Sequence, residues 1–180
     1  GKWLLTSSAT EEGAEGFCAE KSIFVENNSL LYFKKNLSRE FQLLSLLQMR
    51  LHMQPEFPEK SQVENVLKTV LEVNPVRLGE RPLKLAEKQK DAVLSAISSP
   101  FLIISGGPGT GKTSVAVTLL RVLKRLGLAK RPALAAPTGR AAKRMSEAVV
   151  SSLRSLENLE QLEEDLELLD VASGAKTLHR

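Results

Sequence analysis

A glycine-rich run from Gly106 to Thr113, Gly-Gly-Pro-Gly-Thr-Gly-Lys-Thr, carries the most specific chemistry of this sequence. Glycines let the backbone curl so that successive N–H groups converge on phosphate oxygens, and a helix after the loop would add the positive end of its dipole. Lys112 should then reach the β- and γ-phosphates of a nucleoside triphosphate, and the Thr113 hydroxyl should bind Mg²⁺. The run therefore predicts a phosphate loop in which Lys112 and Thr113 act in phosphoryl transfer. The expected nucleotide contacts from the loop are Gly106, Gly107, Pro108, Gly109, Thr110, Gly111, Lys112, Thr113 and Ser114.

Gln89 lies on a segment, Leu83 to Ser98, whose pattern predicts a helix ending shortly before this loop. Its side-chain amide has a donor face and an acceptor face, which can pair with N7 and N6 of adenine. An ordinary exposed glutamine would look the same in the sequence, so Gln89 decides little by itself. Together with the loop it makes ATP, with Mg²⁺, the expected ligand.

A second candidate anion site follows in Pro137-Thr138-Gly139-Arg140, where a short apolar run passes into a helix. Backbone N–H groups at the start of the helix, the Thr138 hydroxyl and the Arg140 guanidinium could together hold a phosphate of a nucleic-acid backbone. Lys143 and Arg144 lie one turn further along. The alternative is an ordinary capped helix with a basic surface, and these residues alone leave both interpretations open.

The formal net charge is +4, and the charges are segregated along the chain. Between Phe101 and Ser146 there is no Asp or Glu, whereas Glu147 to Asp170 is rich in acids and holds one base, Arg154. Clustered cations attract polyanions and gain affinity from counterion release, so the basic block favours a nucleic-acid partner over a merely solvated helix face. The cations of this block are Lys112, Arg121, Lys124, Arg125, Lys130, Arg131, Arg140, Lys143 and Arg144.

Alternating strands and helices are needed to position these groups. The apolar run Phe101 to Ser105 fits a strand covered on both faces, and it leads directly into the glycine loop. The next expected elements are a helix from Lys112 to Leu126 closed by Gly127, a second strand from Ala133 to Ala136, and a helix from Gly139 to about Leu153. This alternation predicts an α/β fold with a parallel sheet and right-handed crossovers.

The residues before this region predict a small α+β domain over 1–76. Two β-favouring runs, Ser22 to Glu26 and Leu30 to Lys34, fit a hairpin around an Asn-Asn pair. Ser38 is the expected cap of a helix through about Met53, and the capping box Ser61-Gln62-Val63-Glu64 is expected to open the next helix. Prolines and a glycine then mark a linker over 77–82, so the second domain is expected over 83–180.

Leucines recur at steps of three and four from Leu153 to Leu169, with acids between them, and this pattern predicts one amphipathic helix. Packing of these leucines on the domain is favoured over a partner-binding coiled coil, because coiled coils sustain more heptads.

Two further features limit the class of protein. Cys18 has no Cys or His neighbour at metal-ligand spacing and is interpreted as a small filler residue. No apolar run approaches the roughly 20 residues that cross a bilayer, and the first residues lack the apolar stretch of a signal peptide. No membrane association and a cytoplasmic location are therefore expected.

Several motifs, taken together, resemble the RecD family of superfamily 1 helicases. They are the helix around Gln89, the loop with its preceding Ile103-Ile104-Ser105, the segment Ala136 to Ala142, and Thr177-Leu178-His179-Arg180. The resemblance implies a partial RecA-like P-loop NTPase domain, with Gln89 as the adenine reader and 106–113 as motif I. It also implies contacts to single-stranded DNA from Pro137, Thr138, Gly139, Arg140, Thr177 and His179.

The resemblance further implies an ATP-driven motor that moves 5′ to 3′ on single-stranded DNA in double-strand-break repair and recombination. Such a motor works in the bacterial cytoplasm, in association with the nucleoid. RecB and RecC are the implied partners where the motor is part of exonuclease V, whereas a stand-alone relative would have neither. Leu30-Leu31-Tyr32-Phe33 and the helix that follows are similar to the small domain before the motor in this family.

In this family the Asp-Glu pair of motif II follows the segment that ends here at Arg180. The chain is therefore interpreted as an N-terminal fragment that binds ATP without turning it over. Two other classes stay open. One is a stand-alone nucleotide switch or small-molecule kinase that uses the same loop, and the other is an interaction domain that docks through the leucine helix.

Overall fold

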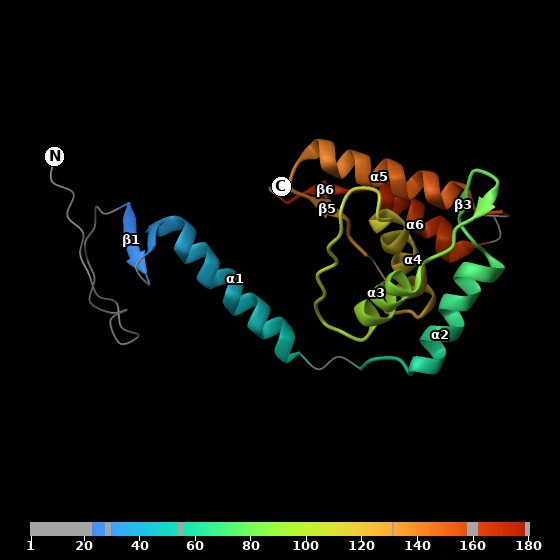
Figure 1. The fold of residues 1–180 in the computed structure, drawn as a ribbon, viewed down its shortest axis with the longest axis horizontal. Helices are drawn as coiled ribbons and strands as arrows, with labels where there is room; N and C mark the ends of the chain where they lie inside the picture. The colour runs from blue at the N-terminus through green and yellow to red at the C-terminus, as the bar shows by residue number, and fades with distance from the viewer. Residues whose placement is uncertain (1–22, 28–29, 54–55, 131, 158–161, 179–180) are drawn as a thin grey trace. The chain divides into compact units, whose positions relative to one another are not determined.

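The computed structural model describes residues 23–27, 30–53, 56–130, 132–157 and 162–178, so the expectations for Cys18 and His179 lie outside the described residues. The chain divides into two compact units, Gly1–Gln54 and Pro55–Arg180 (Figure 1). This division falls before the linker expected at 77–82. No helix of the described residues is long and apolar enough to cross a membrane.

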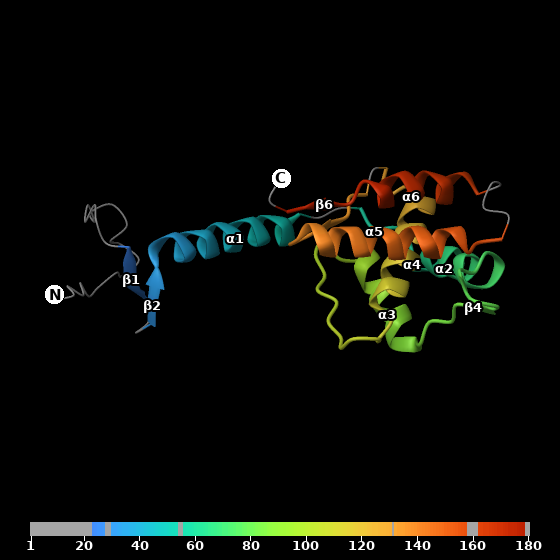
Figure 2. The same cartoon turned by 90° about the horizontal axis from the view of Figure 1, so that it is seen from above.

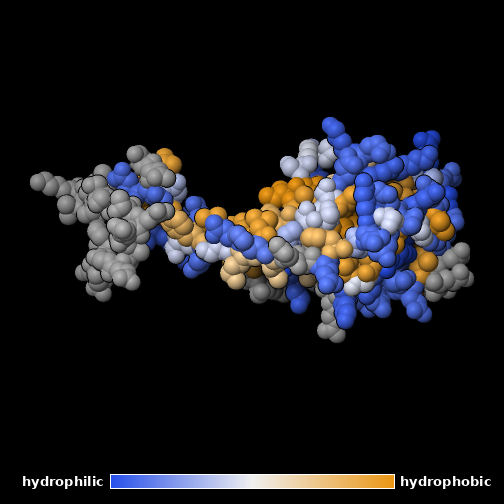
Figure 3. Space-filling view, turned by 90° about the horizontal axis from the view of Figure 1, so that it is seen from below, coloured by the Kyte–Doolittle hydropathy of each residue, from blue (hydrophilic) through white to orange (hydrophobic). Residues whose placement is uncertain are grey.

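The described part of the first unit is a hairpin followed by one long helix. β1 (Phe24–Asn27) pairs antiparallel with β2 (Leu30–Phe33), which confirms the expected hairpin. α1 (Lys34–His52) follows β2 directly, so the expectation that Ser38 caps this helix is wrong. None of the α1 residues is buried, and Figure 3 shows apolar surface along the helix.

The second unit is built around the helix α4. This helix contacts α2, η1, α3, α5 and α6, and Figures 1 and 2 show these elements gathered around it. α5 and α6 lie side by side in both views and pack on one another. The elements in chain order are α2 (Lys60–Lys68), the π-helical turn η1 (Thr69–Val73), β3 (Arg77–Leu78), β4 (Arg81–Pro82), α3 (Glu87–Ile97), α4 (Lys112–Arg125), β5 (Ala135–Ala136), α5 (Gly139–Arg154), α6 (Glu163–Ser173) and β6 (Lys176–Thr177).

Aliphatic side chains from all these helices form one buried core. α2 and η1 contribute Val63, Leu67 and Val70 to this core, and both elements contact α4. Burial of apolar surface is the main force that holds elements together, so α2 and η1 belong to the second unit and not to a domain over 1–76. The expected linker 77–82 is itself the short hairpin of β3 and β4.

The start of α2 differs from the expected capping box. The helix begins at Lys60, its N-cap is Glu59, and no side chain caps it. Ser61 therefore lies inside the first turn, where its hydroxyl is not at the N-cap position.

The described part of the sheet in this unit is small. β5 and β6 are parallel, with Ala135 opposite Lys176 and Ala136 opposite Thr177, so the fold is mixed α/β with a parallel pair. The run Phe101 to Ser105 is not a strand, because none of the described strands pairs with it and a strand needs a neighbour for its backbone hydrogen bonds. A complete RecA-like sheet is therefore not formed by the described residues.

The leucine-rich acidic stretch forms two elements and not one helix. α5 ends at Arg154 and α6 begins at Glu163, so the single helix expected from Leu153 to Leu169 is wrong. Of the described leucines in this pattern, Leu153 and Leu156 are buried in the core and Leu162 and Leu169 pack against it, which confirms packing on the domain, whereas Leu166 is exposed.

Candidate functional site

The glycine loop passes from an extended segment into the first turn of α4. Gly109 and Gly111 have φ angles of 75° and 76°, in the left-handed region that favours glycine. The Thr110 hydroxyl donates to the carbonyl oxygen of Gly107 over 2.9 Å and closes the loop on itself. Gly111 immediately precedes α4, so the unpaired N–H groups of the first helical turn open at the end of the loop.

Lys112 folds back over the loop. Its Nζ donates to the carbonyl oxygens of Gly106 and Gly107, over 2.7 and 2.5 Å. Thr113 follows in the first turn of α4 and is exposed, and Ser114 after it is half-buried. The fold thus brings a cation, a hydroxyl and free backbone N–H groups to one helix N-terminus, which is the set that a phosphate chain requires.

Neighbouring side chains lie close against two loop glycines and would have to move to admit a Cβ. A Cβ at Gly106 would lie 2.7 Å from Thr110 Oγ1, and one at Gly111 would lie 2.6 Å from Gln89 Nε2. Gln89 therefore lies beside the loop, as an adenine-reading residue must. Its amide is bonded to backbone on both sides, because Oε1 accepts from Ala86 N and Nε2 donates to Thr110 O.

The second anion site lies where β5 passes into α5. Thr138 is the N-cap of α5, and its hydroxyl accepts a hydrogen bond from the N–H of Ala141 over 3.2 Å. β5 and β6 are parallel, so their carboxyl ends meet at the same edge, and a Cβ at Gly139 would lie 3.9 Å from Thr177 Cγ2. Residues that are far apart in the sequence, Thr138 and Thr177, are thereby brought to one place. Pro137, Gly139 and Arg140 are exposed there.

Residues 89–180, just over half of the chain, match the model of the AAA domain family. The chain belongs to this family. Its AAA domain is a P-loop NTPase domain, which agrees with the glycine loop at the start of α4.

Curated proteins named RecBCD enzyme subunit RecD match part of this chain. The RecBCD enzyme subunit RecD of Haemophilus influenzae is 44% identical over 92 residues, and that of Mycolicibacterium smegmatis is 42% identical over 80 residues. These alignments cover 51% and 42% of this chain, and 14% of either relative. The resemblance to RecD is confirmed for the aligned part, and the chain spans only that small share of the relatives' length.

Protein groups alone do not build a metal site in the described part of the AAA domain. No group of three His, Cys, Asp or Glu side chains there could hold an ion. The Thr113 hydroxyl is a single oxygen donor, whereas Mg²⁺ takes six oxygen ligands and usually keeps several waters. The residues therefore fit Mg²⁺ as part of a complex with the triphosphate.

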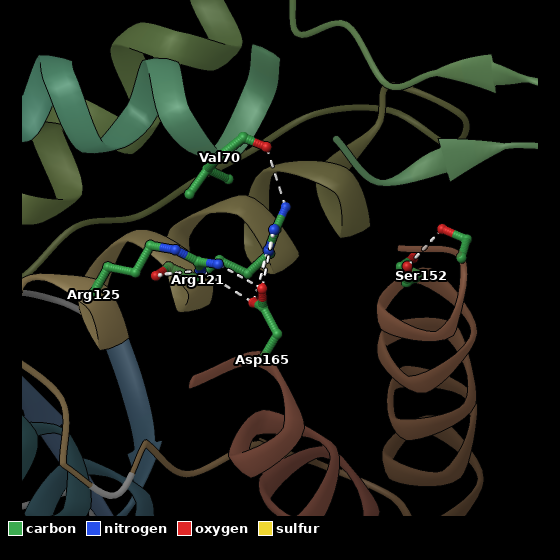
Figure 4. A network of polar contacts seen from close by, with 6 residues as sticks. Val70, Arg121, Arg125, Ser152 and Asp165 are labelled. Carbon is green, nitrogen blue, oxygen red and sulfur yellow. Dashed lines mark hydrogen bonds and ion pairs between the residues drawn. The ribbon is translucent and has the colours of Figure 1, made fainter. Parts of the chain in front are cut away.

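The basic block of the AAA domain is partly neutralised inside the fold. Arg121 and Arg125, one turn apart on α4, both bind the Asp165 carboxylate of α6, with their closest N–O distances at 2.8 and 2.6 Å (Figure 4). Arg121 also donates to the carbonyl oxygen of Val70 in η1 over 3.2 Å. Lys124 pairs with Glu167 of α6. These cations do not face a polyanion, which corrects the prediction made for the whole block.

Asp165 is wholly buried, and sequence reasoning missed it. Burial opposes its charged form, but hydrogen bonds from Arg125 and Arg121 outweigh burial and hold the pKa of the Asp165 carboxyl below its ordinary value. Burial lowers the pKa of Arg121, which still keeps its charge because the ordinary value of an arginine is so high. The signal available in the sequence for this buried ion pair was two arginines four residues apart, Arg121 and Arg125, together with an acid-rich segment later in the chain.

Proposed function

We propose that this chain is the nucleotide-binding, DNA-contacting first part of the motor of a RecD-like, ATP-dependent DNA helicase. The observation that carries the proposal is the glycine loop with Lys112 folded over it, at the N-terminus of α4, in a domain that aligns with RecD subunits. The competing switch or kinase class shares the loop, but the named relatives favour the helicase.

The nucleotide would lie along the loop and the first turn of α4. The backbone N–H groups orient the phosphates, Lys112 exchanges its loop carbonyls for phosphate oxygens, and Gln89 faces adenine. Mg²⁺ would be held by the Thr113 hydroxyl together with the triphosphate, and it would screen charge on the phosphates.

Single-stranded DNA would lie across the start of α5 and the end of β6. Thr138, Gly139 and Arg140 offer a helix N-terminus and a cation to one backbone phosphate, and Thr177 lies beside them. Pro137 and His179 complete the proposed contacts. On the basis of the RecD relatives, the proposal includes movement 5′ to 3′ along the strand and assembly with RecB and RecC.

This chain by itself should bind ATP and hydrolyse it only at background rates. Hydrolysis by such motors needs an acid near Mg²⁺ and an arginine that stabilises the transition state. Asp170 cannot supply the acid from the end of a strand, because it lies within α6.

Calorimetry on the 180-residue chain and two variants tests the proposal. Lys112→Ala should weaken ATP binding by roughly tenfold or more, since a charge-assisted contact is lost, and should leave single-stranded DNA binding unchanged. Arg140→Ala should weaken DNA binding and leave ATP binding unchanged, so each variant is the control for the other.

The outcomes separate the function classes. A preference for ATP over GTP together with salt-dependent DNA binding supports the helicase piece. Nucleotide binding without DNA binding would favour a switch or kinase, and rapid ATP hydrolysis stimulated by single-stranded DNA would contradict the absence of turnover.

A further inference from the structure

The Gln89 side chain joins two backbone segments that lie far apart in the sequence. Its Oε1 accepts a hydrogen bond from the N–H of Ala86 over 2.8 Å, and its Nε2 donates one to the carbonyl oxygen of Thr110 over 2.9 Å. Only one orientation of the amide satisfies both partners, because Ala86 offers a donor and Thr110 an acceptor. The amide therefore ties the start of α3 to the last turn of the phosphate loop.

Gly111, the next residue after Thr110, lies directly against this amide. A Cβ at Gly111 would be 2.6 Å from Gln89 Nε2. The Thr110–Gly111 peptide is trans and planar, so a carbonyl fixed toward Gln89 directs the Gly111 N–H to the opposite side. Gly111 is also the N-cap of α4, so the orientation of this peptide sets the first N–H groups that the helix offers to an anion.

We propose that Gln89 is a positioning residue of the phosphate loop, which holds the Thr110–Gly111 peptide in the orientation that binds phosphate, whichever base the nucleotide carries. This inference rests on the proposed function as a nucleotide-binding loop and adds a second role to the adenine contact. A primary amide has two N–H donors and two acceptor lone pairs, so one of each remains for a base after Ala86 and Thr110 are bonded. The positioning role acts on any ligand with phosphates, whereas the adenine contact acts only on the base.

Two substitutions separate the two hydrogen bonds. Gln89→Ala removes both bonds without adding a charge. Gln89→Glu keeps an oxygen that can accept from the Ala86 N–H but has no donor for the Thr110 carbonyl, and its negative charge itself opposes phosphate binding, so Gln89→Ala decides the binding test. Lys88→Ala is the matched control, because Lys88 is exposed in the same turn of α3. Calorimetry would measure, for each protein, the binding of Mg-ATP and of Mg-tripolyphosphate, which has no base.

We expect Gln89→Ala to weaken tripolyphosphate binding by about fivefold to tenfold and ATP binding by at least that factor, because the adenine contact is lost as well, and Lys88→Ala to change neither. Weaker ATP binding with unchanged tripolyphosphate binding would overturn the proposal and leave Gln89 as a base reader only. If the unsubstituted chain bound neither ligand, the proposed function itself would fail.

A measurement without ligand tests the same contact directly. The backbone amide resonances of Gly111 and Lys112 in heteronuclear NMR spectra of the nucleotide-free chain should shift in both Gln89 variants and stay in place in Lys88→Ala. Thermal melts would establish that each variant is folded. Unmoved Gly111 and Lys112 resonances in folded Gln89 variants would overturn the proposal.

Discussion

At the scale of single residues, two glycines of the phosphate loop are alike in backbone and different in surroundings. Gly109 and Gly111 have φ angles of 75° and 76°. A Cβ at Gly109 would meet nothing within 4 Å, whereas one at Gly111 would lie 2.6 Å from Gln89 Nε2. Substitution of each glycine by alanine therefore distinguishes the cost of backbone strain alone, at Gly109, from the cost of backbone strain combined with a steric conflict, at Gly111.

Gly109→Ala should lower the free energy of unfolding by about 1–2 kcal/mol, the cost of a left-handed conformation for an L-residue. Gly111→Ala should cost about 1 kcal/mol more, because the Gln89 amide must move and lose its bond to Thr110. Urea denaturation measures the free energy of unfolding of both variants. Combining Gly111→Ala with Gln89→Ala should cost less than the sum of the single changes, and strict additivity would contradict the contact.

At the scale of elements, the Asp165 network holds η1, α4 and α6 together (Figure 4). Asp165→Asn should lower the free energy of unfolding by about 3–5 kcal/mol, because two arginines would keep their charge without a counterion in a buried place. Asp170→Asn is the control, since Asp170 is exposed on the same helix, and it should change stability by under about 0.5 kcal/mol. Chemical denaturation of the unsubstituted chain, Asp165→Asn and Asp170→Asn measures these free energies. Similar stabilities of the two variants would contradict a stabilising role of the Asp165 network.

The same carboxylate predicts a pH dependence. Its pKa is lowered in the folded state, so its stabilising effect is complete above the unfolded value of about 3.9 and is lost as the pH falls through the lower folded value. The free energy of unfolding should therefore fall as the pH drops below about 4. Asp165→Asn should lose less stability over the same range. Denaturation at several pH values between neutral and acidic gives the free energy of unfolding of the unsubstituted chain and of Asp165→Asn. An equal loss of stability in both proteins would exclude Asp165 as the origin of the pH dependence.

Local signals in the sequence predict the helices that carry the site and fail for elements that depend on distant partners. α4 and α5 begin at the expected Lys112 and Gly139, because Gly111 and Thr138 supply the turn and the cap within a few residues. The run Phe101 to Ser105 has the composition of a strand, but its conformation depends on neighbouring strands that the described residues do not provide.

Burial of a charged residue is equally hard to predict from local pattern. Asp165 lies in a helix whose acids look alike in the sequence, and only the packing of α6 against α4 decides which carboxylate meets the arginines. The phosphate loop is the opposite case, since its glycines, Lys112 and Thr113 are contiguous and need only the helix that follows.

At the scale of the whole molecule, the two blocks of opposite charge meet inside the second unit. Arg121, Lys124 and Arg125 are paired with acids of α6, so much of the charge that is segregated along the sequence cancels in space. Exposed cations remain at the start of α5, where Arg140, Lys143 and Arg144 follow the Thr138 cap. Lys143 is 3.8 Å from Glu147 and largely exposed, so this pairing leaves it accessible to a phosphate.

This distribution sets the expected salt dependence of single-stranded DNA binding. Each phosphate contact on a single strand contributes roughly −0.7 to the slope of log K against log salt, so the cations of α5 predict a slope of about −2. Arg140→Ala should reduce the slope by about 0.7, whereas Lys130→Ala, an exposed cation of the same basic block, should leave it unchanged. Anisotropy titrations of a labelled oligothymidylate at several NaCl concentrations measure these slopes. A slope near −6 would mean that DNA contacts the whole block and that the pairing with α6 opens when DNA binds, whereas equal effects of Arg140→Ala and Lys130→Ala would mean that DNA contacts extend beyond α5.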